Sequence, residues 1–200
     1  MRIVAGRLRG RLLVAPDDGA IRPTSDRVRE ALFNILAHGI EGFGVEGVRV
    51  LDLFAGTGAL GLEALSRGAT FCLLVEEDAT ARGLIRRNVE ALGLTGQTRI
   101  YRRDATRLGE ALPRERFGLV LADPPYGKGL GERAMAAAAD GGWLDAGAVA
   151  VLEERADVDV VWPPGFEPLD VRRWGDTAVH IARWPGGGAE LEPGPSEAAP

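Results

Sequence analysis

The sequence predicts an α/β protein built on a doubly wound, largely parallel sheet of seven strands, with the last hairpin antiparallel. Three observations support this prediction. From Val48 onward, short apolar segments alternate with amphipathic ones, as strands alternate with helices in parallel sheets. A glycine-rich turn follows the first of these segments directly. Near the C-terminus, only Gly175 and Asp176 separate two strand-like segments, which predicts an antiparallel hairpin.

The first 22 residues have the pattern of a short β-hairpin. Apolar and basic residues alternate through Arg2–Ala5 and Arg9–Val14, with glycines nearby for the turns. An amphipathic helix is expected next, capped by Thr24 or Ser25. Its apolar residues recur at the spacing of one helical face: Val28, Ala31, Leu32 and Ile35. Four glycines between positions 39 and 47 then predict a loop.

The other elements follow from the same alternation. The predicted strands are Val48–Leu53, Phe71–Val75, Arg99–Arg102, Leu119–Ala122, Ala148–Leu152, Leu169–Trp174 and Thr177–Trp184. The predicted helices are Ala59–Ser66, Ala79–Ala91 (capped by Asp78, stopped by Gly93) and Gly131–Ala139. From Pro185 the composition predicts a disordered acidic tail. We therefore expect an N-terminal extension (1–22), one main domain (23–184) and a tail (185–200).

Composition is that of an ordinary globular domain. At 200 residues and 46% hydrophobic, the chain can form one core of good size. No segment approaches the roughly 20 apolar residues that span a bilayer, and we expect no secretory signal. One cysteine and two histidines leave no disulfide framework and no Cys/His metal cluster. The expectation is a cytoplasmic monomer without a metal and without a membrane partner.

Charge is spread unevenly along the chain. The net charge is −5, yet residues 1–15 carry four arginines and no acid, whereas the last sixteen residues carry three glutamates and no base. Attraction to a polyanion depends on the local patch and not on the total. The N-terminal segment is therefore a candidate for phosphate contact, with a solvated arginine-rich surface as the alternative.

The glycine-rich turn predicts a nucleotide site. Gly56, Gly58 and Gly61 fit the spacing G-x-G-x-x-G between a strand and a helix, a pattern shared by NAD, FAD and S-adenosylmethionine proteins. Asp52 beside it would repel a pyrophosphate but suits the cationic amino-acid end of S-adenosylmethionine. Glu76, twenty positions after Gly56, can accept hydrogen bonds from two ribose hydroxyls. Asp104, after the third strand, is placed to meet an adenine amino group.

The fourth strand is followed by Asp123, Pro124, Pro125 and Tyr126, which are the candidate catalytic residues. An exocyclic amino group of a base is a poor nucleophile because its lone pair is delocalised into the ring. The Asp123 carboxylate and the Pro124 carbonyl could accept its two N–H groups and aim the lone pair at a methyl group. The two prolines stiffen the turn, and Tyr126 can stack on a flipped base. Without a nucleotide site, the same residues would be a plain turn.

Four segments together resemble the RsmD-type bacterial 16S rRNA guanine-N2 methyltransferases: residues 1–13, 22–36, 52–61 and 123–126. The likeness runs from the first residue to about Trp184. It implies a Rossmann-like class I S-adenosylmethionine-dependent methyltransferase fold, with S-adenosyl-L-methionine as cofactor. It further implies transfer of one methyl group to N2 of a single guanine in the small ribosomal subunit.

The resemblance also implies roles for individual residues. Phe54, Glu77 and Ala105 would join the cofactor site, and the segment Arg22–Arg29 would close over it. Arg27 and Phe33 would lie beside the cofactor, although spacing alone makes Arg27 and Arg29 equally consistent with solvated helix charges. The implied RNA-binding residues are Arg2, Arg7, Arg9, Arg11, Arg22 and Thr24.

Other functions stay open at the level of sequence. A DNA adenine-N6 or cytosine-N4 methyltransferase would use the same catalytic turn, but 22 N-terminal residues are few for major-groove recognition. A non-catalytic RNA-binding assembly factor could keep the fold, and a nicotinamide dehydrogenase would share the glycine turn. Cytosine C5 methylation is disfavoured, because Cys72 lies inside the second strand and has the pattern of a small buried hydrophobe.

Overall fold

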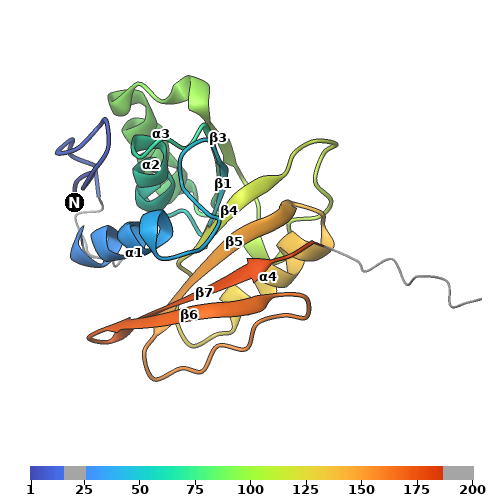
Figure 1. Ribbon diagram of the computed structural model, residues 1–200. Coiled ribbons are helices and arrows are strands. Elements are labelled where there is room, and N and C mark those ends of the chain that lie inside the picture. Colours follow the sequence, from blue (N-terminus) through green and yellow to red (C-terminus); the bar gives the residue numbers. More distant parts are fainter. Residues whose placement is uncertain (16–25, 187–200) are drawn as a thin grey trace, which may run out of the picture.

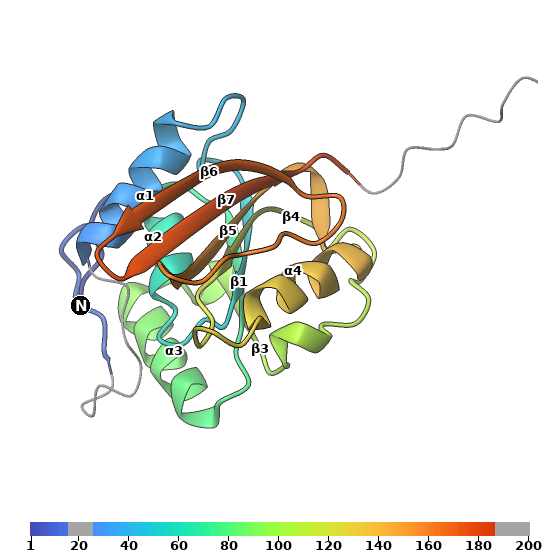
Figure 2. The ribbon, with the colours of Figure 1, turned by 90° about the horizontal axis from the view of Figure 1, so that it is seen from below.

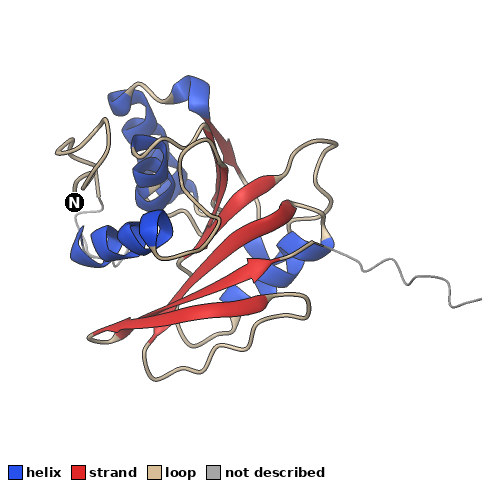
Figure 3. Ribbon diagram, viewed as in Figure 1, coloured by secondary structure: helices blue, strands red, loops and turns tan. Residues whose placement is uncertain are grey.

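A computed structural model describes residues 1–15 and 26–186, whose main feature is one seven-stranded sheet (Figures 1 and 3). The strand order is β3-β2-β1-β4-β5-β7-β6, in which the first five strands are parallel and the β6–β7 hairpin is antiparallel. The predicted fold class is confirmed. The strands are β1 Arg49–Leu53, β2 Phe71–Val75, β3 Thr98–Tyr101, β4 Phe117–Ala122, β5 Leu144–Arg155, β6 Glu167–Trp174 and β7 Thr177–Trp184.

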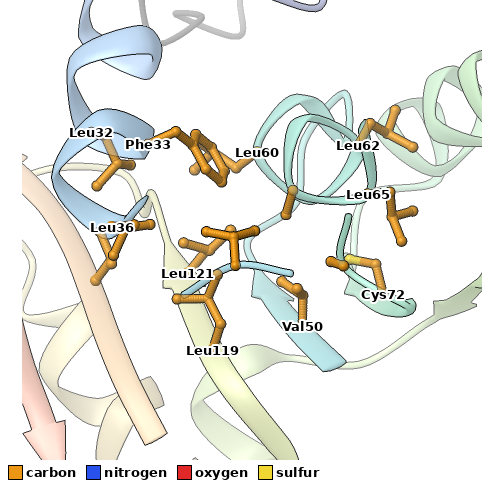
Figure 4. Packing of buried hydrophobic residues seen from close by; sticks show 14 of the residues in the cluster. Leu32, Phe33, Leu36, Val50, Leu60, Leu62, Leu65, Cys72, Leu119 and Leu121 are labelled. Carbon is orange, nitrogen blue, oxygen red and sulfur yellow. The ribbon is translucent and has the colours of Figure 1, made fainter. Parts of the chain in front are cut away.

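Helices cover both faces of the sheet (Figure 2). Helices α1 (Asp26–His38), α2 (Ala59–Ser66) and α3 (Ala79–Leu92) lie on one face. Helix α4 (Leu130–Asp140) and the short 3-10 helix η2 (Ala105–Arg107) lie on the other, and a second 3-10 turn, η1 (Thr95–Gln97), precedes β3. Because side chains of a strand alternate between faces, β1 sends Val50 to the first core and Leu51 to the second. Figure 4 shows the first core, in which α1 and α2 pack on β1 and β4.

The predicted boundaries agree well where local signals are strong. The bounds of α2, β2 and β7 are as predicted. The Asp78 carboxylate accepts a hydrogen bond from the Ala81 backbone N–H at 2.8 Å and begins α3, and Gly93 ends that helix in the left-handed conformation. Strand β5 is longer than predicted and continues to Arg155, a difference that proves important for the site. No helix in the described part of the chain is long and apolar enough to cross a bilayer.

The predicted N-terminal hairpin is present as a short antiparallel pairing, in which the Ile3 N–H donates to the Arg11 carbonyl, the Gly10 N–H to the Ile3 carbonyl and the Leu13 N–H to the Met1 carbonyl. Residues 1–15 form a loop in which a single antiparallel bridge joins Arg2 and Leu12. The backbone N–H groups of Val4 and Ala5 donate to the Glu63 carboxylate on α2, at 2.8 and 3.0 Å. These groups are bound to a helix and so cannot extend a strand ladder. The extension is therefore docked on the main domain, while its predicted continuation through residues 16–22 lies outside the described residues.

Arg29 holds this docking together from inside. Its side chain is fully buried, 2.8 Å from Asp26 and 3.6 Å from the equally buried Glu63, and it also donates to the Arg2 carbonyl. The interpretation of Arg29 as a solvated helix charge is thus wrong. A buried guanidinium joins α1, α2 and the N-terminal segment, and such a group requires these partners because charge is costly to desolvate.

Candidate active site

A cavity of about 990 Å³ opens at the carboxyl ends of β1, β2, β3 and β4. The sheet order reverses between β1 and β4, and ligands of doubly wound sheets bind at such a point. The glycine turn, the residues after β2 and β3, and the Asp123–Tyr126 turn all line the cavity. The N-terminal segment reaches it with Met1. The fold therefore brings together the sites that the sequence predicted separately.

The glycine turn is held in shape by Glu76. One carboxylate oxygen accepts from the Gly56 backbone N–H at 2.9 Å and the other from the Asp78 N–H at 2.8 Å. The turn uses left-handed backbone at Gly56 and also at Phe54, where φ is 58° and a side chain is unusual. Glu76 is only partly buried and lines the cavity, so it remains within reach of a ligand.

Gly58 has a different place from the one predicted. It does not line the cavity, and a Cβ there would lie 3.3 to 3.6 Å from Leu62, Leu74 and Ile85. Its φ of 80° opens helix α2, a conformation that favours glycine. Gly58 therefore turns the chain at the start of α2, and its predicted contact with a cofactor stays a prediction.

Asp52 is almost completely buried beneath the turn. Its carboxylate accepts a hydrogen bond from the Gly61 backbone N–H at 2.9 Å, inside the first turn of α2. Burial raises the pKa of Asp52 to about 7, with a smaller rise from Glu76, while the Gly61 bond opposes the shift. A Cβ at Gly61 would lie 2.9 Å from this carboxylate and 2.5 Å from the Cys72 sulfur, which explains the third glycine. Asp52 also lines the cavity.

Asp104 begins the η2 helix on the far side of the cavity. It accepts from the Thr106 hydroxyl at 2.7 Å and from the Thr106 backbone N–H at 2.8 Å. These hydrogen bonds, the hydroxyl first, lower the pKa of Asp104, and nearby Arg107 and Arg133 add to the effect. The carboxylate is thus ionised at neutral pH and lies beside Ala105, which also lines the cavity.

The Asp123–Tyr126 turn is held by two residues that sequence reasoning missed. The Tyr126 hydroxyl donates to the Glu153 carboxylate at 2.5 Å, and the Gly127 N–H lies 3.0 and 3.1 Å from the two Glu154 oxygens. Both glutamates are nearly fully buried at the end of β5. Burial and Glu153 raise the pKa of Tyr126 well above its usual value, so the hydroxyl remains a donor. The available signal was an acidic pair directly after a predicted apolar strand.

Several predicted contacts do not reach the cavity. Phe33 is fully buried in the core with the Arg67 guanidinium 5.0 Å from its ring, so its predicted place beside a cofactor is wrong. Arg27 is exposed on α1 and does not line the cavity either. Phe54 and Glu77 do line it. Arg22 and Thr24 lie outside the described residues.

Three of the four N-terminal arginines contact the protein itself. Arg2 lies 3.4 Å from Asp26. Arg7 donates to the Gln97 side chain at 2.6 Å, and Arg11 donates to a carbonyl at the end of α3 at the same distance. Arg9 is exposed. These contacts help to dock the segment on α3 and η1, which sequence reasoning did not anticipate.

The charges around the glycine turn indicate which cofactor the cavity can bind. The cavity-lining residues at the ends of β1 and β2 include four acids and, among described residues, no base: Asp52, Glu76, Glu77 and Asp78. Such a wall repels the pyrophosphate of a dinucleotide and favours a cation. S-adenosylmethionine carries a sulfonium and an ammonium group and offers ribose hydroxyls to Glu76. The residues present fit this cofactor better than NAD.

Comparisons with known proteins agree with this chemistry. The family model for conserved hypothetical protein 95 matches residues 1–183. The ribosomal RNA small subunit methyltransferase D of Escherichia coli K12 is 39% identical over 157 residues, covering 78% of this chain and 76% of its own. A solved structure of yhhF from Escherichia coli has a TM-score of 0.77 and 32% identity, and the match covers 92% of this chain and 97% of the other.

A more distant structure contains ligands. It is the Thermus thermophilus 16S rRNA N2 G1207 methyltransferase (RsmC) in complex with AdoMet and guanosine. Its TM-score is 0.56 with 28% identity, and the match covers 84% of this chain and 44% of that one.

Proposed function

The chain belongs to the family of conserved hypothetical protein 95, and from this membership we propose that it is an S-adenosylmethionine-dependent methyltransferase acting on N2 of one guanine in 16S rRNA. The observation that carries the proposal is that the acid-lined glycine turn and the Asp123–Tyr126 turn open onto the same cavity. One turn suits a cationic cofactor and the other suits an amino group. Methyl transfer requires the two within bonding reach.

The residues of the chain divide the work of such a reaction. Glu76 would hold the ribose, Asp104 the adenine amino group, and Asp52 would face the cationic amino-acid end. The cofactor, when bound, supplies the electrophilic methyl group. Asp123 is partly exposed at the cavity and, with the Pro124 carbonyl, would accept the two N–H groups of the target amine. These contacts would hold the amine nitrogen in line with the methyl carbon and the sulfur of the cofactor. Such a fixed orientation supplies much of the rate enhancement of methyl transfer.

The choice of ribosomal RNA as substrate rests on similarity. The Escherichia coli relative is named for the small ribosomal subunit, and the Thermus structure for N2 of a guanine in 16S rRNA. Guanine N2 is an exocyclic amino group, which is the group that the Asp123 turn suits. The proposed substrate is the small ribosomal subunit or one of its assembly intermediates. The proposed enzyme is a monomer that acts in the cytoplasm.

The test is methylation of ribosomal particles that lack this modification. The protein is incubated with radiolabelled S-adenosylmethionine and 30S particles, and the labelled nucleoside of the 16S rRNA is identified after digestion. We expect label in N2-methylguanosine at one position. Duplex DNA is tested in parallel, and label in DNA but not in RNA would contradict the proposal and favour a DNA amino-group methyltransferase. An assembly factor without catalytic activity would label neither.

A further inference from the structure

The wall of the cavity is divided by charge. The acids of the glycine turn lie at the ends of β1 and β2, as described above. On the opposite side the cavity is lined by three arginines, which we call the arginine rim: Arg103, Arg107 and Arg133. A cationic cofactor is attracted to the first side and an anionic ligand to the second, so the two sides suit different molecules.

The arginine rim is built by two packed elements. Arg103 follows β3 and Arg107 ends η2, whereas Arg133 belongs to the second turn of α4. Helix α4 packs against η2, and both Arg107 and Arg133 are close enough to act electrostatically on Asp104, which also lines the cavity. The three charges therefore converge on one stretch of the cavity mouth, although they are up to 30 positions apart in sequence.

The charge of the arginine rim is available to a ligand. All three residues are exposed, and the Arg107 side chain is 86% exposed. Arg103 donates to the Tyr101 hydroxyl at 2.7 Å and Arg133 to the Gly129 carbonyl at 3.2 Å, both neutral oxygens. Arg107 lies 4.0 Å from Asp104, which is a weak exposed pair. These contacts orient the guanidinium groups and leave most of their charge uncompensated.

The arginines of the N-terminal segment are less available to a ligand than those of the arginine rim. In the N-terminal segment, Arg2 has a carboxylate partner, and Arg7 and Arg11 are used to dock the segment. The two basic regions also lie on opposite faces of the sheet, because the N-terminal segment packs with α1–α3 and the arginine rim with α4 (Figure 2). A strand of nucleic acid at the cavity mouth would meet the arginine rim on the α4 side.

We propose that the arginine rim binds the phosphates of the RNA backbone next to the target base. The inference rests on the proposed function and deepens it, because it names the surface that holds the substrate. When a base enters the cavity beside Asp123, its sugar–phosphate chain stays at the mouth. Guanidinium groups recognise phosphate through paired hydrogen bonds, and the acids of the glycine turn repel it. Phosphate contacts at the arginine rim would thus orient the RNA, and the acids of the glycine turn would orient the cationic cofactor.

The test compares two double charge reversals in the full chain. Arg107→Glu with Arg133→Glu alters the arginine rim. Arg114→Glu with Arg116→Glu is the matched control, since these exposed arginines precede β4 at the opposite edge of the sheet and line no part of the cavity. Both variants change the net charge equally. RNA affinity is measured by fluorescence anisotropy with a 16S rRNA fragment at several salt concentrations, and cofactor affinity by calorimetry.

We expect the arginine-rim variant to bind RNA about tenfold or more weakly, because it loses charge-assisted hydrogen bonds to phosphate. Its salt dependence should also fall by roughly 0.7 in log–log slope for each lost phosphate contact. Cofactor affinity should change far less than RNA affinity, because Asp104 keeps both of its hydrogen bonds from Thr106. The inference is overturned if the arginine-rim variant binds RNA like the control, or if only reversal of Arg7 and Arg9 weakens binding. These outcomes are distinct from failure of the proposed function, which the methylation assay of the unaltered protein decides.

Discussion

Two turns at the carboxyl edge of the sheet are stabilised in the same way but with different exposure. After β1, Glu76 of the neighbouring strand end accepts the Gly56 N–H. After β4, Glu153 and Glu154 of neighbouring β5 accept the Tyr126 hydroxyl and the Gly127 N–H. Glu76 still faces the cavity, whereas the two glutamates of β5 are nearly fully buried.

The difference separates two tasks. Glu76 both shapes its turn and is available to a ligand, so its loss should appear directly in cofactor affinity. Glu153 and Glu154 shape the catalytic turn from behind, so their loss should change turnover while cofactor binding is kept. Substitutions at each turn can therefore sharpen or break this comparison.

The largest effect is expected at Asp123. In Asp123→Ala we expect turnover on ribosomal RNA to fall by about 1,000-fold, because removal of one positioned hydrogen-bonding group at a reacting centre typically costs about 10² to 10³ in rate. Calorimetry should show S-adenosylmethionine affinity within about twofold of the unaltered protein. Asp123→Asn, which keeps one acceptor oxygen, is the control and should lie between. A large loss of cofactor affinity in Asp123→Ala would show that this side chain belongs to the other turn.

The second effect concerns the turn after β1. Glu76→Ala removes the acceptor of two backbone N–H groups and of the expected ribose hydroxyls. A hydrogen bond to a charged group contributes on the order of 1.5 to 3 kcal/mol, which corresponds to roughly 10- to 100-fold in cofactor affinity. Turnover at saturating cofactor should change far less. Glu77→Ala, at the adjacent exposed residue that also lines the cavity, is the matched control and should have a smaller effect. Equal losses in the two variants would argue for general charge and against the specific contact.

The third effect tests the buried support of the catalytic turn. Glu153→Ala removes the carboxylate that accepts from the Tyr126 hydroxyl, and we expect turnover to fall about 5- to 10-fold, in line with one hydrogen bond of roughly 1 kcal/mol. Glu153→Gln keeps an acceptor and should rescue most of this loss. Combining Glu153→Ala with Tyr126→Phe should cost no more than Tyr126→Phe alone, because the Tyr126–Glu153 bond is already absent in that variant. Additive losses would mean that Glu153 acts by another route.

The fold and the two turns could be predicted because their signals are local. Strand and helix periodicity, the Asp78 cap and the glycine spacing each need fewer than twenty residues of sequence. The missed features join distant residues. Val4 and Ala5 donate to Glu63, which is 59 and 58 positions away, and this contact ends the antiparallel pairing between residues 1–3 and residues 10–13.

The residues that support the catalytic turn were missed for the same reason. Glu153 and Glu154 are 27 positions from the groups they hold, and only the β4–β5 pairing brings them together. The prediction that Phe33 lies beside the cofactor was wrong for a related reason. Its helix was placed correctly, but the direction of this side chain depends on how α1 packs on α2 (Figure 4). Local patterns locate the turns, and tertiary packing decides what supports them.

The smallest effect concerns the buried carboxylate under the glycine turn. Because burial raises the pKa of Asp52 to about 7, a large fraction of this group carries a proton at neutral pH. A cationic cofactor favours the ionised form, so its binding should release a proton, and its affinity should rise with pH through 7. The rise is limited to about tenfold per pH unit for one proton, and we expect less than tenfold between pH 6 and pH 8.

Titration calorimetry at several pH values in two buffers measures both affinity and proton release. Asp52→Asn keeps an oxygen for the Gly61 N–H but cannot titrate, so its affinity should lose this part of the pH dependence. The ammonium group of the cofactor also titrates near this range, and the comparison with Asp52→Asn separates the two contributions. S-adenosylhomocysteine keeps the ammonium group that Asp52 would face, so it should show a similar trend in the unaltered protein. An unchanged profile in Asp52→Asn would mean that Asp52 shapes the turn, as Glu153 and Glu154 shape theirs, without acting on the charge of the cofactor.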